Sequence, residues 1–188
     1  MIKKTVLRSV VVILIVSLSI GVGTLADNFF DGMDRDNHPR EYSDFVTKYS
    51  SAYGVPEYII YAVIKTESEF DSSITSGDDS VGLMQISPST FELISSLLGE
   101  KYELGMLYDP ETNIKYGTYY LSYLYGIYAR WQTVYAAYNT NTSTVDAWLL
   151  DPRYSSDGMS IDTIPYEETA HYVETVIEAA ELYAKLYY

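Results

Sequence analysis

The sequence contains no cysteine, and this absence removes several kinds of site from consideration. Neither a disulfide, nor a thiolate metal site, nor a lipid-modified cysteine anchor is possible in this chain. Only two histidines occur, His38 and His171, and their distance in the sequence matches no metal-ligand spacing. We therefore expect no metal site.

Positive charge is also scarce. The chain has 12 Lys and Arg against 26 Asp and Glu, which gives a net charge of −14 and an isoelectric point of about 4.3. A protein that binds nucleic acid needs a basic face to neutralise phosphates. The same requirement applies to adhesion to anionic lipid headgroups. The composition therefore excludes nucleic acid as the expected partner.

Strand patterns are missing as well. No stretch keeps an alternation of apolar and polar residues between turn signals, and neither a Gly-rich phosphate loop nor an internal repeat is found. Helix signals are frequent instead: Ser87-Pro88 and Asp109-Pro110 are typical helix starts, and Gly54 and Gly99 are typical ends. The sequence predicts an all-α fold. The expected helices span residues 41–53, 56–67, 88–98, 110–129, 133–138, 145–150 and 165–188.

The first residues have a different character from the rest. Lys3, Lys4 and Arg8 are followed by residues 10–26, which carry no charge and are mostly apolar. A basic start before an apolar run is typical of an export signal or an N-terminal membrane anchor, and a buried core helix is the alternative. We expect residues 1–26 to be a signal peptide or anchor, 27–40 a polar linker, and 41–188 the main domain. Either form of the first segment predicts an extracytoplasmic location.

One acid occupies an unusual position. Ile60, Val63 and Ile64 mark the buried face of a predicted helix, and Glu67 falls on the same face because it lies seven residues after Ile60. A carboxylate there is either a satisfied structural group or a working acid. The spacing alone leaves both interpretations open.

Four blocks of residues together resemble the soluble lytic transglycosylase family of peptidoglycan-cleaving enzymes. They occur in the family's order and extend from about Tyr53 to Val176. The blocks are Glu67-Ser68-x-Phe70 with Ser76 and Gly82-Leu83-Met84-Gln85-Ile86; Asp109-Pro110-Glu111-Thr112-Asn113-Ile114; Ala136-Ala137-Tyr138-Asn139; and Ile164-Pro165-Tyr166-Glu167-Glu168-Thr169 with Tyr172-Val173. The resemblance implies a helical domain of the goose-type lysozyme kind and cleavage of the bond between N-acetylmuramic acid and N-acetylglucosamine in peptidoglycan strands.

The resemblance also implies site residues. Glu67 matches the family's catalytic acid and base. The residues that match substrate-binding positions are Ser76, Met84, Gln85, Tyr138, Asn139 and Glu168. Glu168 has a second interpretation as a carboxylate that only caps the last helix.

The chain departs from the family pattern in three places. Asp79-Ser80 replaces the usual Gly-Ala, Ser87 stands where Met is frequent, and Thr140-Asn141-Thr142 replaces a Gly-containing turn. Asn141 is a residue type that can take the left-handed conformation that such a turn needs. These departures affect the predicted preference for particular sugars and peptide stems, and they leave Glu67 in place.

The implied reaction needs an acid that is still protonated near neutral pH. In the family, the glutamate donates a proton and then activates the C6 hydroxyl of muramic acid, which closes a 1,6-anhydro ring without a metal or an organic cofactor. A hydrolytic muramidase is an alternative that needs a second carboxylate, for which the nearby acids are Asp71, Asp78 and Asp79, with Asp79 the foremost candidate. A non-catalytic wall-binding or secretion-assembly subunit is a further alternative.

Overall fold

The computed structural model describes residues 19, 21, 22, 32–101 and 103–188, and the chain divides into two units, Met1–Pro39 and Arg40–Tyr188. The predicted signal or anchor, residues 1–26, lies outside the described residues except at positions 19, 21 and 22. Residues 32–37 are helical, within the stretch predicted as a linker. No helix among the described residues is both long enough and apolar enough to cross a membrane.

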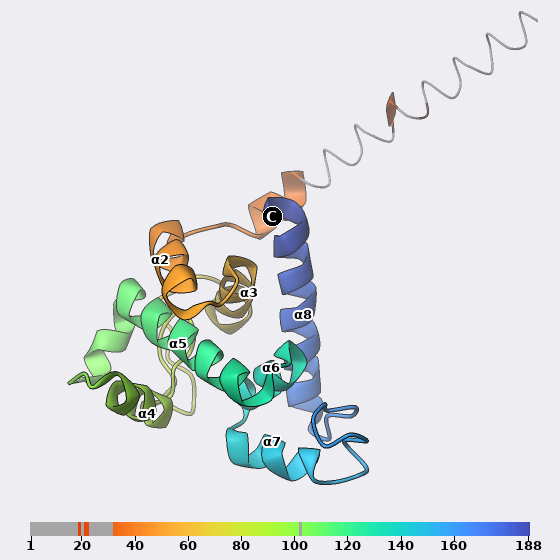
Figure 1. Cartoon of the computed structure of the whole chain (residues 1–188). Helices are drawn as coiled ribbons and strands as arrows, with labels where there is room; N and C mark the ends of the chain where they lie inside the picture. Colours follow the sequence, from red (N-terminus) through yellow and green to blue (C-terminus); the bar gives the residue numbers. More distant parts are fainter. Residues whose placement is uncertain (1–18, 20, 23–31, 102) are drawn as a thin grey trace, which may run out of the picture. The chain divides into compact units, whose positions relative to one another are not determined.

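The second unit is built from helices joined by loops (Figure 1). They are α2 Ser43–Tyr53, α3 Glu57–Ser68, α4 Pro88–Leu98, the 3-10 helix η1 Leu104–Tyr108, α5 Pro110–Tyr128, α6 Trp131–Asn139, α7 Thr142–Leu149 and α8 Glu167–Tyr187. In the described part of the chain, β structure is limited to isolated bridges of Val81 with Thr75 and with Ile86. The predicted all-α class is therefore confirmed.

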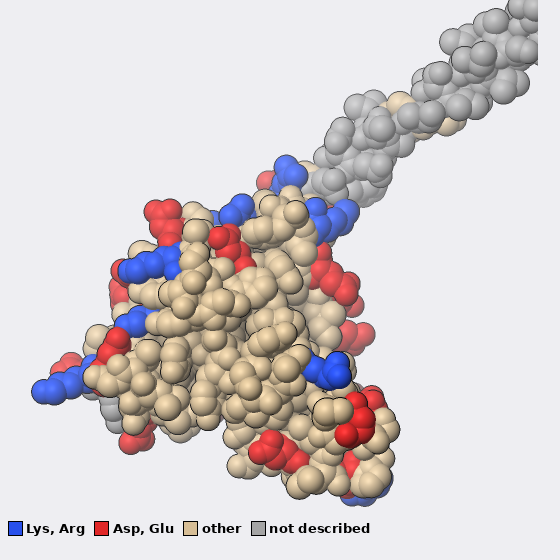
Figure 2. Space-filling model, in the orientation of Figure 1, with Lys and Arg blue, Asp and Glu red and all other residues tan. Residues whose placement is uncertain are grey.

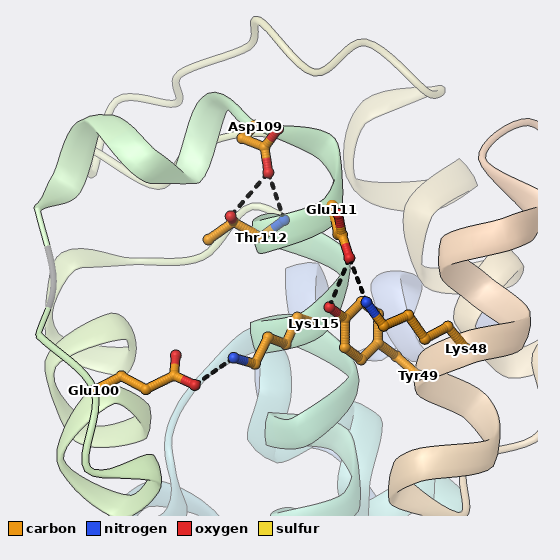
Figure 3. Close-up of polar contacts among 7 residues, drawn as sticks. All are labelled: Lys48, Tyr49, Glu100, Asp109, Glu111, Thr112 and Lys115. Atoms are coloured by element: carbon orange, nitrogen blue, oxygen red, sulfur yellow. Dashed lines mark hydrogen bonds and ion pairs between the residues drawn. The ribbon is translucent and has the colours of Figure 1, made fainter.

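Local signals set the helix ends. The Ser87 hydroxyl accepts a hydrogen bond from the Thr90 amide (3.1 Å) at the start of α4, and Pro88 occupies the first turn. Asp109 caps α5 in the same way through the Thr112 amide (2.9 Å), as Figure 3 shows. A capping side chain stabilises a helix by about 1 kcal/mol because it satisfies an amide that has no partner within the helix. The predicted starts of these two helices are confirmed.

The core is centred on α3. Residues 59–64 are all buried, so this helix is covered on every side and not along one stripe alone. It packs against α8 and α2, while α6 packs on both α5 and α8 (Figure 1). Each fully buried aliphatic side chain contributes about 2 kcal/mol to stability. Glu67, near the end of α3, is thus attached to the most deeply buried helix of the fold.

Polar side chains link α5 to its neighbours at the surface (Figure 3). The Glu111 carboxylate accepts hydrogen bonds from Lys48 Nζ (2.6 Å) and Tyr49 Oη (3.0 Å) of α2, and Lys115 pairs with Glu100 after α4. Solvent screens the attraction in exposed pairs of this kind, so they orient the helices more than they stabilise them. On the face of this unit in Figure 2, Lys and Arg lie among Asp and Glu without forming a continuous basic surface.

Candidate active site

A pocket of about 1110 Å³ opens beside the end of α3. Its walls come from the 76–90 segment, from α5, from the end of α6 and from the start of α8. Six of the seven predicted site residues line it: Glu67, Ser76, Gln85, Tyr138, Asn139 and Glu168. Segments that are far apart in the sequence therefore meet around Glu67.

Glu67 is the most perturbed acid in this pocket. Its side chain is largely withdrawn from solvent, and Tyr172 Oη of α8 donates a hydrogen bond of 2.6 Å to Glu67 Oε1. Burial raises the pKa of Glu67 to about 7; the Tyr172 hydrogen bond opposes this rise, and the negative charge of Asp78 adds to it. A carboxyl group with a pKa near 7 can both give and take a proton at neutral pH.

The end of α3 fixes where Glu67 points. Glu69 and Phe70 both have positive φ angles, 49° and 70°, which turn the chain sharply out of the helix. The Ser68 hydroxyl donates to the Leu83 carbonyl (2.8 Å) and so ties the helix end to the 75–86 segment. Glu67 is therefore positioned by the Ser68–Leu83 hydrogen bond on one side and by Tyr172 of α8 on the other.

The 75–86 segment is organised by one buried amide. Asn113 of α5 is fully buried; its Oδ1 accepts from the Met84 amide, and its Nδ2 donates to the carbonyls of Val81 and Leu107, each at 2.8 Å. The segment makes backbone hydrogen bonds of its own, such as those between Val81 and Ile86, and the Asn113 side chain adds contacts that join it to α5 and η1. The Asn113 side chain therefore holds the loop that forms one wall of the pocket.

Replacing Gly82 with Ala is expected to destabilise the protein by about 2 kcal/mol more than replacing Gly99 with Ala. A Cβ on Gly82 meets Asn113 Nδ2 at 2.3 Å and the Leu107 carbonyl at 2.6 Å, whereas nothing lies within 4 Å of one on Gly99. Both glycines have positive φ angles, so the conformational cost is shared. Urea denaturation of the two variants measures the difference, and equal losses of stability contradict the packing argument.

Met84 is the predicted site residue that does not line the pocket. Its side chain is fully buried against Gly117, where an added Cβ would lie 2.3 Å from the Met84 sulfur. Its backbone carbonyl accepts a hydrogen bond from Tyr138 Oη (2.7 Å). The structure thus connects Met84 to the pocket through its backbone, by positioning Tyr138.

Asp78, in the 75–86 segment, is an acidic residue at the wall of the pocket. This residue lines the pocket, whereas Asp79 is exposed outside the lining and has a positive φ of 64°. Among the three acids that the sequence offers as a second carboxylate, Asp78 is the one beside Glu67. Gln85 lies across the same loop, where its side-chain amide donates to the Gly82 carbonyl (2.8 Å).

The turn after Asn139 differs from the expectation. Asn141 has a φ of −172°, which is extended, and its side chain accepts from the Thr144 amide (2.9 Å) as the cap of α7. Asn141 therefore does not use the left-handed conformation that its residue type allows, because capping the next helix requires an extended residue at that position. Asn139 ends α6 and remains exposed at the pocket.

Glu168 lies in the first turn of α8, where it is exposed and lines the pocket beside Glu167. Both of its predicted interpretations are compatible with this position, since acids are also favourable at a helix N-terminus.

Tyr172 was missed as a site residue because it also fits the apolar stripe of the last helix. The feature that could have indicated a role for Tyr172 is its hydroxyl group, which needs a hydrogen-bond partner once the ring is buried.

No cluster of three or more His, Asp or Glu side chains suited to a metal ion is found within the ranges that the structure describes. The pocket combines one acid of raised pKa, amide and hydroxyl groups, and aromatic rings. Such a lining is typical of sites that bind hydroxylated ligands and transfer protons.

Residues 44–157 match the family model of the transglycosylase SLT domain. The chain belongs to this family. It is 32% identical over 159 residues to the soluble lytic murein transglycosylase of Escherichia coli, which covers 82% of this chain and 24% of that protein. It therefore spans about a quarter of the length of that relative.

Two solved structures extend the similarity to the fold. The 70-kDa soluble lytic transglycosylase of Escherichia coli superposes with a TM-score of 0.71 and 28% identity over 81% of this chain and 25% of that one. An inactive glutamate-to-glutamine mutant of the lytic transglycosylase Slt from Pseudomonas aeruginosa has the same TM-score at 30% identity, over 79% of this chain and 24% of that one. The predicted lysozyme-like fold of the described domain is confirmed by these matches.

Proposed function

We propose that this chain is a peptidoglycan lytic transglycosylase that cleaves the bond between N-acetylmuramic acid and N-acetylglucosamine. The observation that carries the proposal is the half-buried Glu67, whose pKa is raised to about 7 at the wall of a pocket large enough for sugar rings. The names of the similar proteins support the substrate class. The inactive glutamine mutant of the Pseudomonas aeruginosa protein supports a requirement for one glutamate in such sites.

In the proposed reaction Glu67 performs both proton transfers. Its protonated carboxyl donates to the glycosidic oxygen, and the C1–O4 bond breaks as positive charge develops at C1 of the muramic acid. The resulting carboxylate then accepts the proton of the C6 hydroxyl, whose oxygen bonds to C1 and closes the 1,6-anhydro ring. The Tyr172 hydroxyl stabilises the carboxylate between the two steps by its hydrogen bond.

The remaining parts of the chain and pocket receive roles in the same proposal. Residues 41–188 act as the catalytic domain, and residues 1–26 export it or hold it at the outer side of the membrane, with 27–40 as the linker. Glycan strands lie in the pocket against the side chains of Ser76, Gln85, Tyr138, Asn139 and Glu168, with Met84 acting through its backbone. Neither a metal nor an organic cofactor takes part.

The proposal is tested by digesting peptidoglycan with the purified full-length chain and analysing the released products by mass spectrometry. We expect soluble muropeptides with an anhydro-muramic end, which are lighter by one water than the corresponding hydrolysed products. Walls with different peptide stems are used in parallel, because the stem preference is set by loops that depart from the family pattern. Failure to release soluble muropeptides from any of these walls contradicts the proposed function.

Replacing Tyr172 with Phe is expected to move the alkaline limb of the pH–activity profile upward by about one pH unit. Activity falls as Glu67 loses its proton, and the hydrogen bond from Tyr172 lowers the pKa of Glu67. Removing the hydroxyl therefore raises that pKa further. Initial rates of muropeptide release between pH 5 and 9 measure the limb.

Tyr128 offers the matched control for this change. Its hydroxyl donates to Asp146 (2.9 Å), and neither residue lines the pocket. The Tyr128→Phe variant should keep the position of the alkaline limb, even where it costs some stability. An identical shift in both variants means that the Tyr172 effect does not act through Glu67.

A further inference from the structure

Asp78 is a second carboxylate in the pocket of Glu67, and its side chain is held in place. The Ser76 hydroxyl donates to Asp78 Oδ1, and the Ser80 hydroxyl donates to Oδ2 (3.1 Å). Ser80 is buried, so one of the two supports belongs to the rigid part of the loop. Both oxygen atoms of Asp78 are thus oriented by the protein, although the residue is reached by solvent.

The two carboxyl groups are pushed toward opposite protonation states. The hydrogen bond from Ser76 holds the pKa of Asp78 below its ordinary value, whereas burial raises the pKa of Glu67 to about 7. Two acids whose environments separate their pKa values are the usual arrangement of an acid and a base in glycoside cleavage. Near neutral pH Asp78 is therefore a carboxylate that can accept a proton, and Glu67 is a group that can donate one.

The other groups around Glu67 do not disturb this division. Tyr172 of α8 and Tyr138 of α6 face it, and burial raises the pKa of both tyrosines well above the ordinary value, so both stay neutral. The start of α8 adds only the acids Glu167 and Glu168 to the lining, and no Lys or Arg is among the lining residues. On α3 itself, Lys65 pairs with Glu69 at 3.6 Å.

We propose that Asp78 binds and deprotonates a water molecule in this pocket, so that the chain releases hydrolysed muropeptides beside the anhydro products. The inference rests on the proposed function, because it uses the same substrate and the same acid. In this branch Glu67 gives its proton to the leaving oxygen and the C1–O4 bond breaks. The water oxygen then bonds to C1 while Asp78 accepts its proton, and the muropeptide ends in a free reducing sugar.

The two branches compete for the same electrophilic carbon. In the transglycosylase branch the attacking hydroxyl is part of the substrate and is therefore always near C1. In the hydrolytic branch the water must be bound, and a carboxylate with two fixed oxygen atoms provides that binding. The ratio of the two products consequently reports on Asp78 and does not depend on how much folded enzyme is present.

The experiment measures this ratio with the full-length chain acting on peptidoglycan. Products are treated with borodeuteride, which labels reducing ends and leaves anhydro ends unchanged, and mass spectrometry counts both against a blank without enzyme. We expect labelled products from the wild-type chain. Asp78→Asn should lower the ratio of reducing to anhydro ends by about tenfold or more, which is a small effect for the loss of a general base.

Asp79→Asn is the matched control, because it removes the same charge one residue further along, outside the lining. It should leave the product ratio unchanged. If Asp78→Asn does not fold, Asp78→Ser is used, which lacks the carboxylate but can still bond to the neighbouring hydroxyls, and the same fall in the ratio is expected.

Each outcome has one meaning. Anhydro products alone from the wild-type chain overturn the inference and leave the proposed function standing. An unchanged ratio in the Asp78 variants also overturns it. Release of neither product by the wild-type chain is a failure of the proposed function itself.

Discussion

Replacing Glu67 with Gln is expected to lower the release of muropeptides by about 10³-fold, the range that general acid and base assistance contributes. The amide has almost the same shape as the carboxyl group, and its oxygen can still accept the hydrogen bond from Tyr172. It can neither donate a proton to the glycosidic oxygen nor accept one from the attacking group. Both product classes should fall together, because both need the leaving oxygen to be protonated.

Glu69→Gln is the control for this variant, since Glu69 lies two residues away and its side chain is 81% exposed. We expect its rate of muropeptide release to match that of the wild-type chain. A Glu67→Gln variant that keeps more than about a tenth of the wild-type rate argues for a different acid in the pocket. Circular dichroism of each variant shows whether the helical fold is retained.

Replacing Asn113 with Ala is expected to lower the free energy of unfolding by about 4 kcal/mol. The change leaves two buried backbone groups, the Met84 amide and the Leu107 carbonyl, without a partner, while the Val81 carbonyl keeps only its bond from the Ile86 amide (3.1 Å). Each unsatisfied buried group costs about 1–3 kcal/mol, and the missing side chain also leaves a void. Urea denaturation followed by far-ultraviolet circular dichroism measures the loss.

Asn141→Ala provides a graded comparison. Asn141 also uses its side chain to bond a backbone amide, that of Thr144, but at an exposed helix start. Its removal should cost only about 1 kcal/mol, because water satisfies the freed amide. Similar losses of unfolding free energy at the two positions would show that the hydrogen bonds of Asn113 do not hold the 75–86 segment in place as we describe.

The sequence predicts helix starts well where a capping Ser or Asp is followed directly by Pro. Ser87 and Asp109 define α4 and α5, and the observed helices begin one residue later, at the prolines. The start of α7 was missed because residues 142–144 are Ser and Thr, which favour loops as often as first helical turns. The short helix η1 was also missed, since a 3-10 turn of five residues has no periodicity to detect.

The candidate site is predictable only in part. Helical periodicity places Glu67 on a buried face, and the family resemblance supplies the segments that line the pocket with it. Two features depend on tertiary structure and have no local signal. One is the hydroxyl of Tyr172, which arrives from a helix 105 positions away. The other is the choice of Asp78 over its neighbour Asp79, which follows from the turn that directs adjacent side chains to different sides.

The raised pKa of Glu67 also has a consequence for the stability of the protein as the pH changes. Its pKa is about 7 in the folded chain and near 4.5 when the chain is unfolded and hydrated, so the folded state holds a proton that the unfolded state releases. Its contribution is intact below about pH 4.5, is lost as the pH rises through 7, and amounts to about 3 kcal/mol at most. The Glu67→Gln variant does not titrate at this position.

The difference in unfolding free energy between Glu67→Gln and the wild-type chain should therefore grow in favour of the variant between pH 4.5 and pH 8. Comparing the two proteins at each pH cancels the titration of all groups that they share. A difference that stays constant over this range contradicts the raised pKa. The inactive variant is thus expected to be the more stable protein in neutral and alkaline buffer, because the proton that the reaction needs is bound at the expense of folding free energy.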